Sequence, residues 1–353
     1  MKELSFNQGR LAFSPEKLHM LPVLPDTVEF RIKAFVMNAS GLEERGFIDF
    51  DLLEVQRNTN EGVWLHLAGT LGDEFWKHLA KFLDLSDEQL KLLRGPHTQA
   101  AFEDFKNGMF WTLMRPSVTD RADAIETINF FMTEKVLVTR QFSHDQAFSL
   151  ASHRLMEKGE QFSDVEVDAL AAALIEDVIE SYVDLLKLGG AQLEDLQNKI
   201  IFNPGKEELY MINRAQQLIW IFLNQIWPVE TVLKAMQRTR NPVLSTRGRL
   251  LIAYRQDETE AVIRLFETYR AMSYNLMDVY VSGLSLRTNE TTTILTVIAT
   301  LILPPSLIAA IYGMNFFIPE VHAPLGYYIC LAGMFLVSGG LLYWLKHKGY
   351  VSL

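Results

Sequence analysis

Residues 291–319 have the sequence TTTILTVIATLILPPSLIAAIYGMNFFIP, without one charged side chain. This stretch exceeds the roughly 20 residues that an α-helix needs to cross a bilayer. A second uncharged stretch covers residues 321–345, and Glu320 is the only charged residue between the two. Buried helices of a soluble core seldom need so much apolar chain, so the sequence predicts a hairpin of two transmembrane helices.

The chain before this hairpin predicts an unusually long helix. Between Thr246 and Leu303 there is no proline, and Gly248 and Gly283 are the only glycines. Apolar residues recur there with helical spacing, which predicts one helix from near Thr246 to near Gly313. At a rise of 1.5 Å per residue its length is about 100 Å, so we expect a stalk that continues into the membrane.

The rest of the chain predicts a mixed domain followed by a helical hairpin. Residues 63–67, 128–132 and 135–140 have strand-like sequences, whereas 75–82 and 87–93 have helical spacing. From Val165 to about Gln237 the pattern is helical, with a break at Asn203-Pro204-Gly205 that is typical of a hairpin tip.

The predicted fold class is an α+β cytoplasmic domain with a long stalk helix and two transmembrane helices. In chain order we expect a cytoplasmic α/β domain (1–162), its helical hairpin (163–241), the stalk (242–290), the first transmembrane helix (291–313), an outer loop (314–324), the second transmembrane helix (325–345) and a basic tail (346–353).

Charge predicts the orientation in the membrane. Lys346, His347 and Lys348 follow the second span, and the link between the spans has no Lys or Arg. The positive-inside rule therefore places the stalk and the C-terminus in the cytoplasm and the link outside. The polar N-terminus lacks the pattern of a signal peptide, so we expect it in the cytoplasm and the protein in the inner membrane.

Composition argues against several other classes. The net charge of −10 disfavours a nucleic-acid partner, and Cys330 is the only cysteine, which excludes a disulfide within the chain. The sequence has no GxxxxGK[ST] loop for ATP, and its scattered histidines predict no tight metal site. Ser143-His144-Asp145 is contiguous and cannot be taken for a catalytic triad, so we expect no enzyme and no covalently bound cofactor.

One face of the first span carries small or hydroxyl-bearing residues. Steps of three and four residues give Asn289, Thr292, Thr296, Thr300, Leu303, Ser306, Ala310 and Gly313. Two helices cannot enclose a water-filled path, so conduction requires several chains, with this face lining the pore. The alternative is that the hydroxyls only pack helices together. Leu303 suits a hydrophobic gate, beside the helix-weakening pair Pro304-Pro305.

The segment Tyr312-Gly313-Met314-Asn315-Phe316 resembles the signature of the CorA family of divalent-cation channels. Asp278-Val279-Tyr280, Thr288-Asn289-Glu290 and residues 295–300 are similar to the stalk base and pore entrance of that family. The resemblance implies a funnel-shaped homopentamer in the lipid bilayer that moves Mg²⁺, Co²⁺ or Ni²⁺. It further implies a selectivity filter of Gly313, Met314 and Asn315 that binds the hydrated ion, with Glu320 in an outer acidic ring.

The sequence also departs from the family. The acidic positions that sense cytoplasmic Mg²⁺ in the family correspond here to Leu92 and Tyr254. Asp104, Asp257 and Asp278 are the nearby candidates for metal sensing. Transport of Zn²⁺ in the manner of ZntB, with or without proton coupling, is therefore an alternative. A membrane-anchored oligomeric interaction or sensor protein that transports nothing is a second alternative.

Overall fold

The structure is a computed structural model that describes residues 31–38, 41–45, 61–116, 125–142, 148, 152–153, 155–156, 167–202, 204–314 and 325–349. The chain forms two compact units. The first comprises Met1–Leu196 and Met211–Tyr274, and the second comprises Gln197–Tyr210 and Asn275–Leu353.

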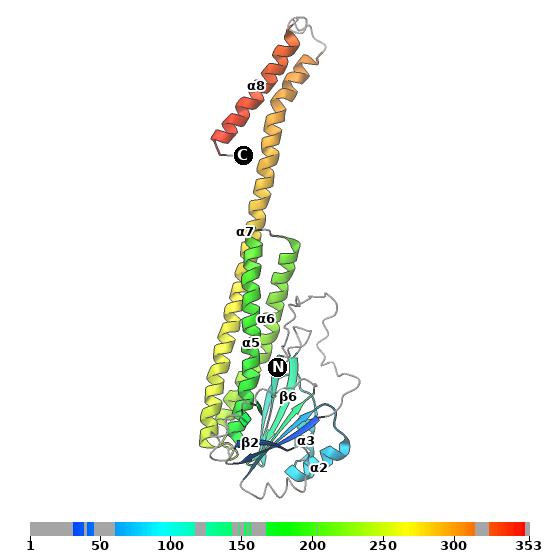
Figure 1. The fold of residues 1–353 in the computed structure, drawn as a ribbon, viewed down its shortest axis with the longest axis vertical. Coiled ribbons are helices and arrows are strands. Elements are labelled where there is room, and N and C mark those ends of the chain that lie inside the picture. Colours follow the sequence, from blue (N-terminus) through cyan, green and yellow to red (C-terminus); the bar gives the residue numbers. More distant parts are fainter. Residues whose placement is uncertain are drawn as a thin grey trace, which may run out of the picture. The chain divides into compact units, whose positions relative to one another are not determined.

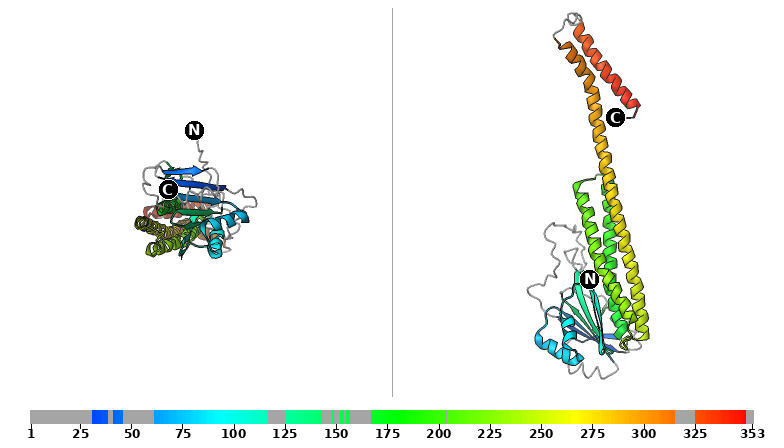
Figure 2. Two further views of the ribbon diagram at one scale, coloured as in Figure 1. Left: turned by 90° about the horizontal axis from the view of Figure 1, so that it is seen from below. Right: turned by 180° about the vertical axis from the view of Figure 1, so that it is seen from behind.

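The first unit contains a mixed sheet (Figures 1 and 2). Its seven strands have the order β2-β1-β3-β7-β6-β5-β4, and only β3 and β7 pair in parallel among the described strands. The strands are β1 (Arg31–Asn38), β2 (Gly41–Arg45), β3 (Gly62–Ala68), β4 (Ala101–Phe105), β5 (Gly108–Pro116), β6 (Ile125–Met132) and β7 (Val136–Gln141). The three strands predicted from the sequence are thus confirmed as β3, β6 and β7.

Two short helices cover one face of this sheet. They are α2 (Asp73–Leu83) and α3 (Asp87–Arg94), both of which the helical spacing predicts. Trp76, Leu79 and Phe82 of α2 pack with Leu65 of β3 and Val138 of β7 in one apolar core. The start of α3 is fixed by a capping box, in which Ser86 accepts a hydrogen bond from the amide of Gln89 and the Gln89 side chain accepts one from the amide of Ser86.

Three long helices follow the sheet. They are α5 (Val167–Phe202), α6 (Lys206–Arg238) and α7 (Thr246–Tyr312), so the predicted hairpin and the predicted long helix are confirmed. In the first unit they lie side by side, and the Tyr182 hydroxyl of α5 donates to the Met114 carbonyl of β5 at 2.7 Å. Phe266 of α7 packs its ring against Tyr182 and against Phe222 of α6.

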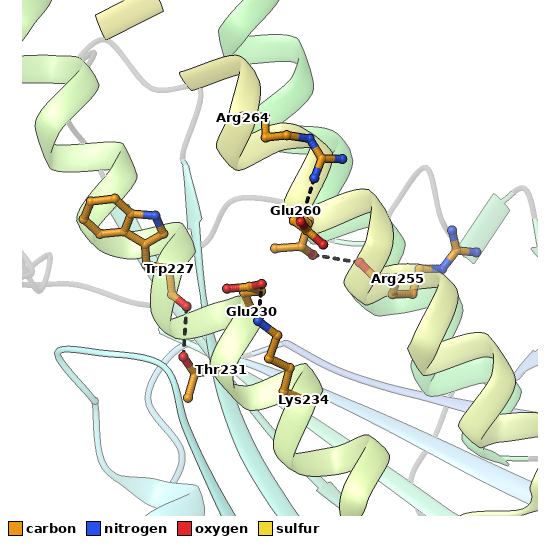
Figure 3. A network of polar contacts seen from close by, with 8 residues as sticks. Trp227, Glu230, Thr231, Lys234, Arg255, Glu260 and Arg264 are labelled. Atoms are coloured by element: carbon orange, nitrogen blue, oxygen red, sulfur yellow. Dashed lines mark hydrogen bonds and ion pairs between the residues drawn. The ribbon is translucent and has the colours of Figure 1, made fainter. Parts of the chain in front are cut away.

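Ion pairs lie on half-buried and exposed positions of these helices. Lys234 pairs with Glu230 along α6, and Arg264 pairs with Glu260 along α7 (Figure 3). Exposed pairs of this kind contribute about 0.3–0.5 kcal/mol each, so the apolar contacts between helices decide the packing.

The second unit contains the tip of the α5–α6 hairpin, the last part of α7, and α8 (Gly326–His347). At the tip, Pro204 lies close to Gly283 of α7, where an added Cβ atom would be 3.3 Å from the proline ring. Beyond this point α8 runs alongside α7 in the opposite direction (Figure 1). These two helices contain the two segments that the sequence predicts to span the membrane.

Candidate ion pathway

The described part of the chain contains two helices long and apolar enough to cross a membrane, within α7 and α8. None of the most apolar 18-residue window of α7 is buried, and only 6% of that of α8. A core helix of a soluble protein would be buried, because its apolar side chains need cover from water. These helices therefore leave their apolar side chains free for lipid or for other copies of the chain.

Aromatic side chains mark both ends of α8. Tyr327 and Tyr328 are exposed near its start, and Tyr343 and Trp344 are exposed near its end. The two pairs are about 24 Å apart along the helix, given a rise of 1.5 Å per residue. Tyr and Trp are enriched where the apolar membrane core meets the headgroups. The two aromatic pairs of α8 therefore suit the two interfaces of a bilayer.

An exposed stripe of α7 follows a strict alternation of three- and four-residue steps. From Asn289 it passes through Thr292, Thr296, Ala299, Leu303, Ser306, Ala310 and Gly313, all of them exposed. Toward the N-terminal side the same alternation gives Asn275, Asp278, Ser282 and Ser285, which are exposed as well. We call these twelve positions the α7 stripe. A repeat of 3.5 residues is the one that keeps a seam facing a common axis in a helical assembly.

Thr300 lies beside the α7 stripe. Its side chain is half-buried, as are those of Val297, Leu301 and Pro304. These positions mark the side of α7 that α8 covers, where the Ser338 hydroxyl of α8 donates to the Leu301 carbonyl at 3.1 Å. A pore-lining role for Thr300 stays a prediction. Ala299 is the stripe position that the sequence analysis missed, and strict alternation of the steps would have found it.

Three hydroxyl groups in the membrane part of the α7 stripe have their protons engaged. Thr292, Thr296 and Ser306 each donate to the carbonyl four residues earlier, at 2.9, 2.8 and 2.9 Å. The oxygen lone pairs then remain as acceptors on the exposed side. A hydrated cation presents water hydrogens outward, so acceptors are the groups that its water shell can bind.

Leu303 lies between Thr296 and Ser306 in the α7 stripe. Its side chain is 68% exposed, so it packs little within the chain. Pro304 and Pro305 come next and lie inside the helix. Neither has an amide hydrogen to donate to the carbonyls of Thr300 and Leu301. The helix is therefore weakened beside the leucine that the sequence analysis singled out as a gate.

At the end of α7, the backbone of Gly313 is not covered by a side chain of its own. The helix ends at Tyr312, and the Gly313 amide still donates to the Ala309 carbonyl at 2.9 Å. An added Cβ atom on Gly313 would lie 3.2 Å from that carbonyl oxygen, a tight contact that favours glycine. Met314 is exposed. Asn315 and Glu320, the other predicted filter and ring residues, lie outside the described residues.

The three candidates for metal sensing have different surroundings. Asp104 of β4 accepts hydrogen bonds from the Thr239 hydroxyl and from the Asn241 side-chain amide, the latter at 2.6 Å. Its carboxylate thus holds the connection between α6 and α7 on the sheet. Asp257 and Asp278 are exposed on α7, and Asp278 belongs to the α7 stripe. The described residues contain no group of three or more His, Cys, Asp or Glu side chains placed to hold a metal.

The sequence analysis placed Leu92 and Tyr254 at the sensing positions that are acidic in the family, a correspondence that stays a prediction. Leu92 packs against the sheet core, and Tyr254 is 58% exposed with the Arg255 guanidinium 5.1 Å from its ring centroid. Neither side chain offers a carboxylate oxygen, the ligand that Mg²⁺ prefers in proteins.

A buried histidine in the sheet titrates outside its ordinary range. His66 of β3 is hydrogen-bonded through Nδ1 to the Thr139 hydroxyl at 2.8 Å. Burial, followed by the positive charges of Lys33 and Arg140, lowers the pKa of His66 to about 4. Burial also lowers the pKa of Arg140 to about 10, which leaves it cationic at neutral pH. His66 is thus a neutral residue with a structural role in the sheet.

Comparison with known families matches residues 59–347 to a family described as "CorA-like Mg2+ transporter protein". The chain belongs to this family. The family resemblance inferred from the sequence is therefore confirmed, and CorA proteins are channels or transporters rather than enzymes.

Individual CorA proteins are similar along most of the chain. The cobalt/magnesium transport protein CorA of Thermotoga maritima is 25% identical over 321 residues, which cover 90% of this chain and 92% of that protein. The complete structure of the CorA magnesium transporter from Methanocaldococcus jannaschii has a TM-score of 0.72 at 19% identity, covering 91% and 98% of the two chains.

A cytoplasmic domain of ZntB has the same fold as the corresponding part of this chain. That domain, from Vibrio parahaemolyticus, has a TM-score of 0.57 at 11% identity and covers 72% of this chain and 97% of its own. Identities this low establish the fold alone. The predicted fold class of an α+β domain with a long helix and two spans is confirmed by the CorA structure.

Proposed function

We propose that this chain is a subunit of a homopentameric channel that moves Mg²⁺, and with it Co²⁺ and Ni²⁺, across the inner membrane. The N- and C-termini are on the cytoplasmic side. The observation that carries the proposal is the α7 stripe, whose membrane part is exposed, mostly small or hydroxyl-bearing, and ends at Gly313. Five such stripes around one axis would enclose a polar path that two helices of one chain cannot enclose.

The ion passes through this path with its water shell. Mg²⁺ gives up water reluctantly, so a filter for the bare ion would have to supply the dehydration energy. The carbonyl oxygens of the Gly313 backbone and of the Asn315 side chain can instead accept hydrogen bonds from the water shell. Thr292, Thr296 and Ser306 continue a line of acceptors, because their protons are bound within the helix.

Acidic side chains raise the local concentration of the cation. Glu320 provides an outer ring, and Asp278 of the α7 stripe provides a ring on the cytoplasmic side. The membrane potential drives uptake and contributes about 4.6 kcal/mol per 100 mV for a divalent ion, so ATP is not needed.

The test is divalent-cation flux into liposomes that contain the purified protein. We expect Asn315→Ala and Gly313→Ala each to abolish Mg²⁺ flux while the oligomer stays intact in size-exclusion chromatography. Phe335→Leu, an exposed position on α8, is the matched membrane control and should keep the flux. Unchanged flux in both filter variants would refute the filter.

The alternatives predict different results in the same liposomes. A membrane-anchored interaction or sensor protein would carry no divalent ion at all. A ZntB-like protein would carry Zn²⁺, with a rate that follows the proton gradient if transport is proton-coupled. The replacement of acidic sensing positions by Leu92 and Tyr254 leads us to propose that cytoplasmic Mg²⁺ does not close this channel through that pair.

A further inference from the structure

Two consecutive prolines leave α7 with two carbonyls that lack their helical donors. In an α-helix the amide of residue 304 donates to the carbonyl of Thr300, and the amide of residue 305 donates to that of Leu301. Pro304 and Pro305 have no amide hydrogen. No water reaches lipid-facing backbone in the hydrocarbon core, so each freed carbonyl needs a donor from the protein.

The Leu301 carbonyl receives such a donor from the neighbouring helix. The Ser338 hydroxyl of α8 donates to it at 3.1 Å, and both residues are half-buried. This bond departs from the behaviour of the nearby hydroxyls in α7. Thr296, Thr300 and Ser306 all donate to the carbonyl four residues earlier in their own helix. Ser338 instead replaces the amide that Pro305 lacks.

We propose that Ser338 is a positioning residue, which fixes the proline segment of α7 to α8 and thereby holds the wall of the pore beside Leu303. The inference rests on the proposed channel function for its effect on transport. Without the hydroxyl, the Leu301 carbonyl is left without a donor and the segment next to Leu303 is free to shift. Divalent flux through the resting channel then rises.

Thermal unfolding of the purified full-length protein in detergent tests the hydrogen bond itself. Four proteins are compared: the unaltered chain, Ser338→Ala, Pro305→Ala, and the double variant. We expect Ser338→Ala to lower the unfolding midpoint by about 2–4 °C when Pro305 is present. In the Pro305→Ala background the same change should have no effect, because the new amide serves the Leu301 carbonyl. Ser338→Thr, which keeps the hydroxyl, should retain the original midpoint.

A matched control separates this coupling from a general loss of packing. Ser306→Ala removes a hydroxyl next to the same prolines, but one that donates to Ile302 within α7. Its effect on the midpoint should be the same with proline or alanine at position 305. An equal loss for Ser338→Ala in both backgrounds would overturn the proposal.

Flux measured on the same four proteins tests the positioning role. With Pro305 present, we expect Ser338→Ala to raise resting Mg²⁺ flux about threefold. A change of this size corresponds to the loss of a typical hydrogen bond between membrane helices. With alanine at position 305, Ser338→Ala should leave the flux unchanged. An equal rise in both backgrounds, or none, would contradict the role. If the unaltered chain carried no divalent ion, the channel function would fail, whereas the unfolding midpoints would still decide whether the bond exists.

Discussion

At the residue scale, His66 gives the first unit a pH-dependent stability. Its pKa is about 4 in the folded protein, against 6.5 for an ordinary histidine in an unfolded chain. The unfolded chain therefore binds a proton that the folded one refuses, and stability falls as the pH drops from 6.5 toward 4. The full loss is about 3 kcal/mol. Chemical denaturation between pH 7.5 and 4.5 would measure it.

Substitution separates this effect from other titrating groups. His66→Gln should remove most of the pH dependence in that window. Thr70→Gln, at an exposed position without a titrating side chain, should leave it unchanged. A slope that survives in His66→Gln would show that another group is responsible.

Asp104 is a second position where the surroundings decide the role. Because its carboxylate accepts hydrogen bonds from Thr239 and Asn241, we expect Asp104→Ala to lower the free energy of unfolding by about 2 kcal/mol. Glu103→Ala, at an exposed position on the same strand, should change it by less than about 0.5 kcal/mol. Chemical denaturation checks both. Unchanged stability of Asp104→Ala, with altered Mg²⁺ dependence of flux, would support metal sensing instead.

At the element scale, substitution of two adjacent glycines of α5 by alanine should change the stability in opposite directions. A Cβ atom on Gly190 would collide with the Tyr269 hydroxyl of α7, whereas one on Gly189 would meet no atom within 4 Å. We expect Gly190→Ala to lower the free energy of unfolding by about 1–2 kcal/mol. Gly189→Ala should raise it by up to about 1 kcal/mol, because alanine favours a helix. Chemical denaturation of both variants measures the difference, and equal effects would contradict the close α5–α7 packing.

Regular elements were predictable from the sequence because their patterns are local. The uncharged stretches predicted the apolar segments of α7 and α8, and the proline-free run from Thr246 predicted most of the length of α7. The break at Pro204 gave the tip of the α5–α6 hairpin. The order of the strands was not predicted, because pairing of β3 with β7 joins residues about 70 positions apart and leaves no local pattern.

Contacts between elements were likewise invisible in the sequence. Asp104 was a sensing candidate by its charge, and only the fold brings it to Thr239 and Asn241. Ser338 showed no periodic signal. Only Pro305 indicated this contact in the sequence. Because proline has no amide hydrogen, the Leu301 carbonyl needs a hydrogen-bond donor from another element.

At the scale of the whole molecule, the account depends on hydrated divalent ions crossing the membrane along the stripes of several copies of α7. The most direct measurement compares the flux of Mg²⁺, Co²⁺, Ni²⁺ and Zn²⁺ into one preparation of liposomes, with membrane potential and proton gradient set independently. We expect the flux of Mg²⁺, Co²⁺ and Ni²⁺ to increase with the membrane potential and to be independent of the proton gradient. The flux should be absent in Asn315→Ala. Absence of any divalent flux, or Zn²⁺ flux alone that follows the proton gradient, would contradict it.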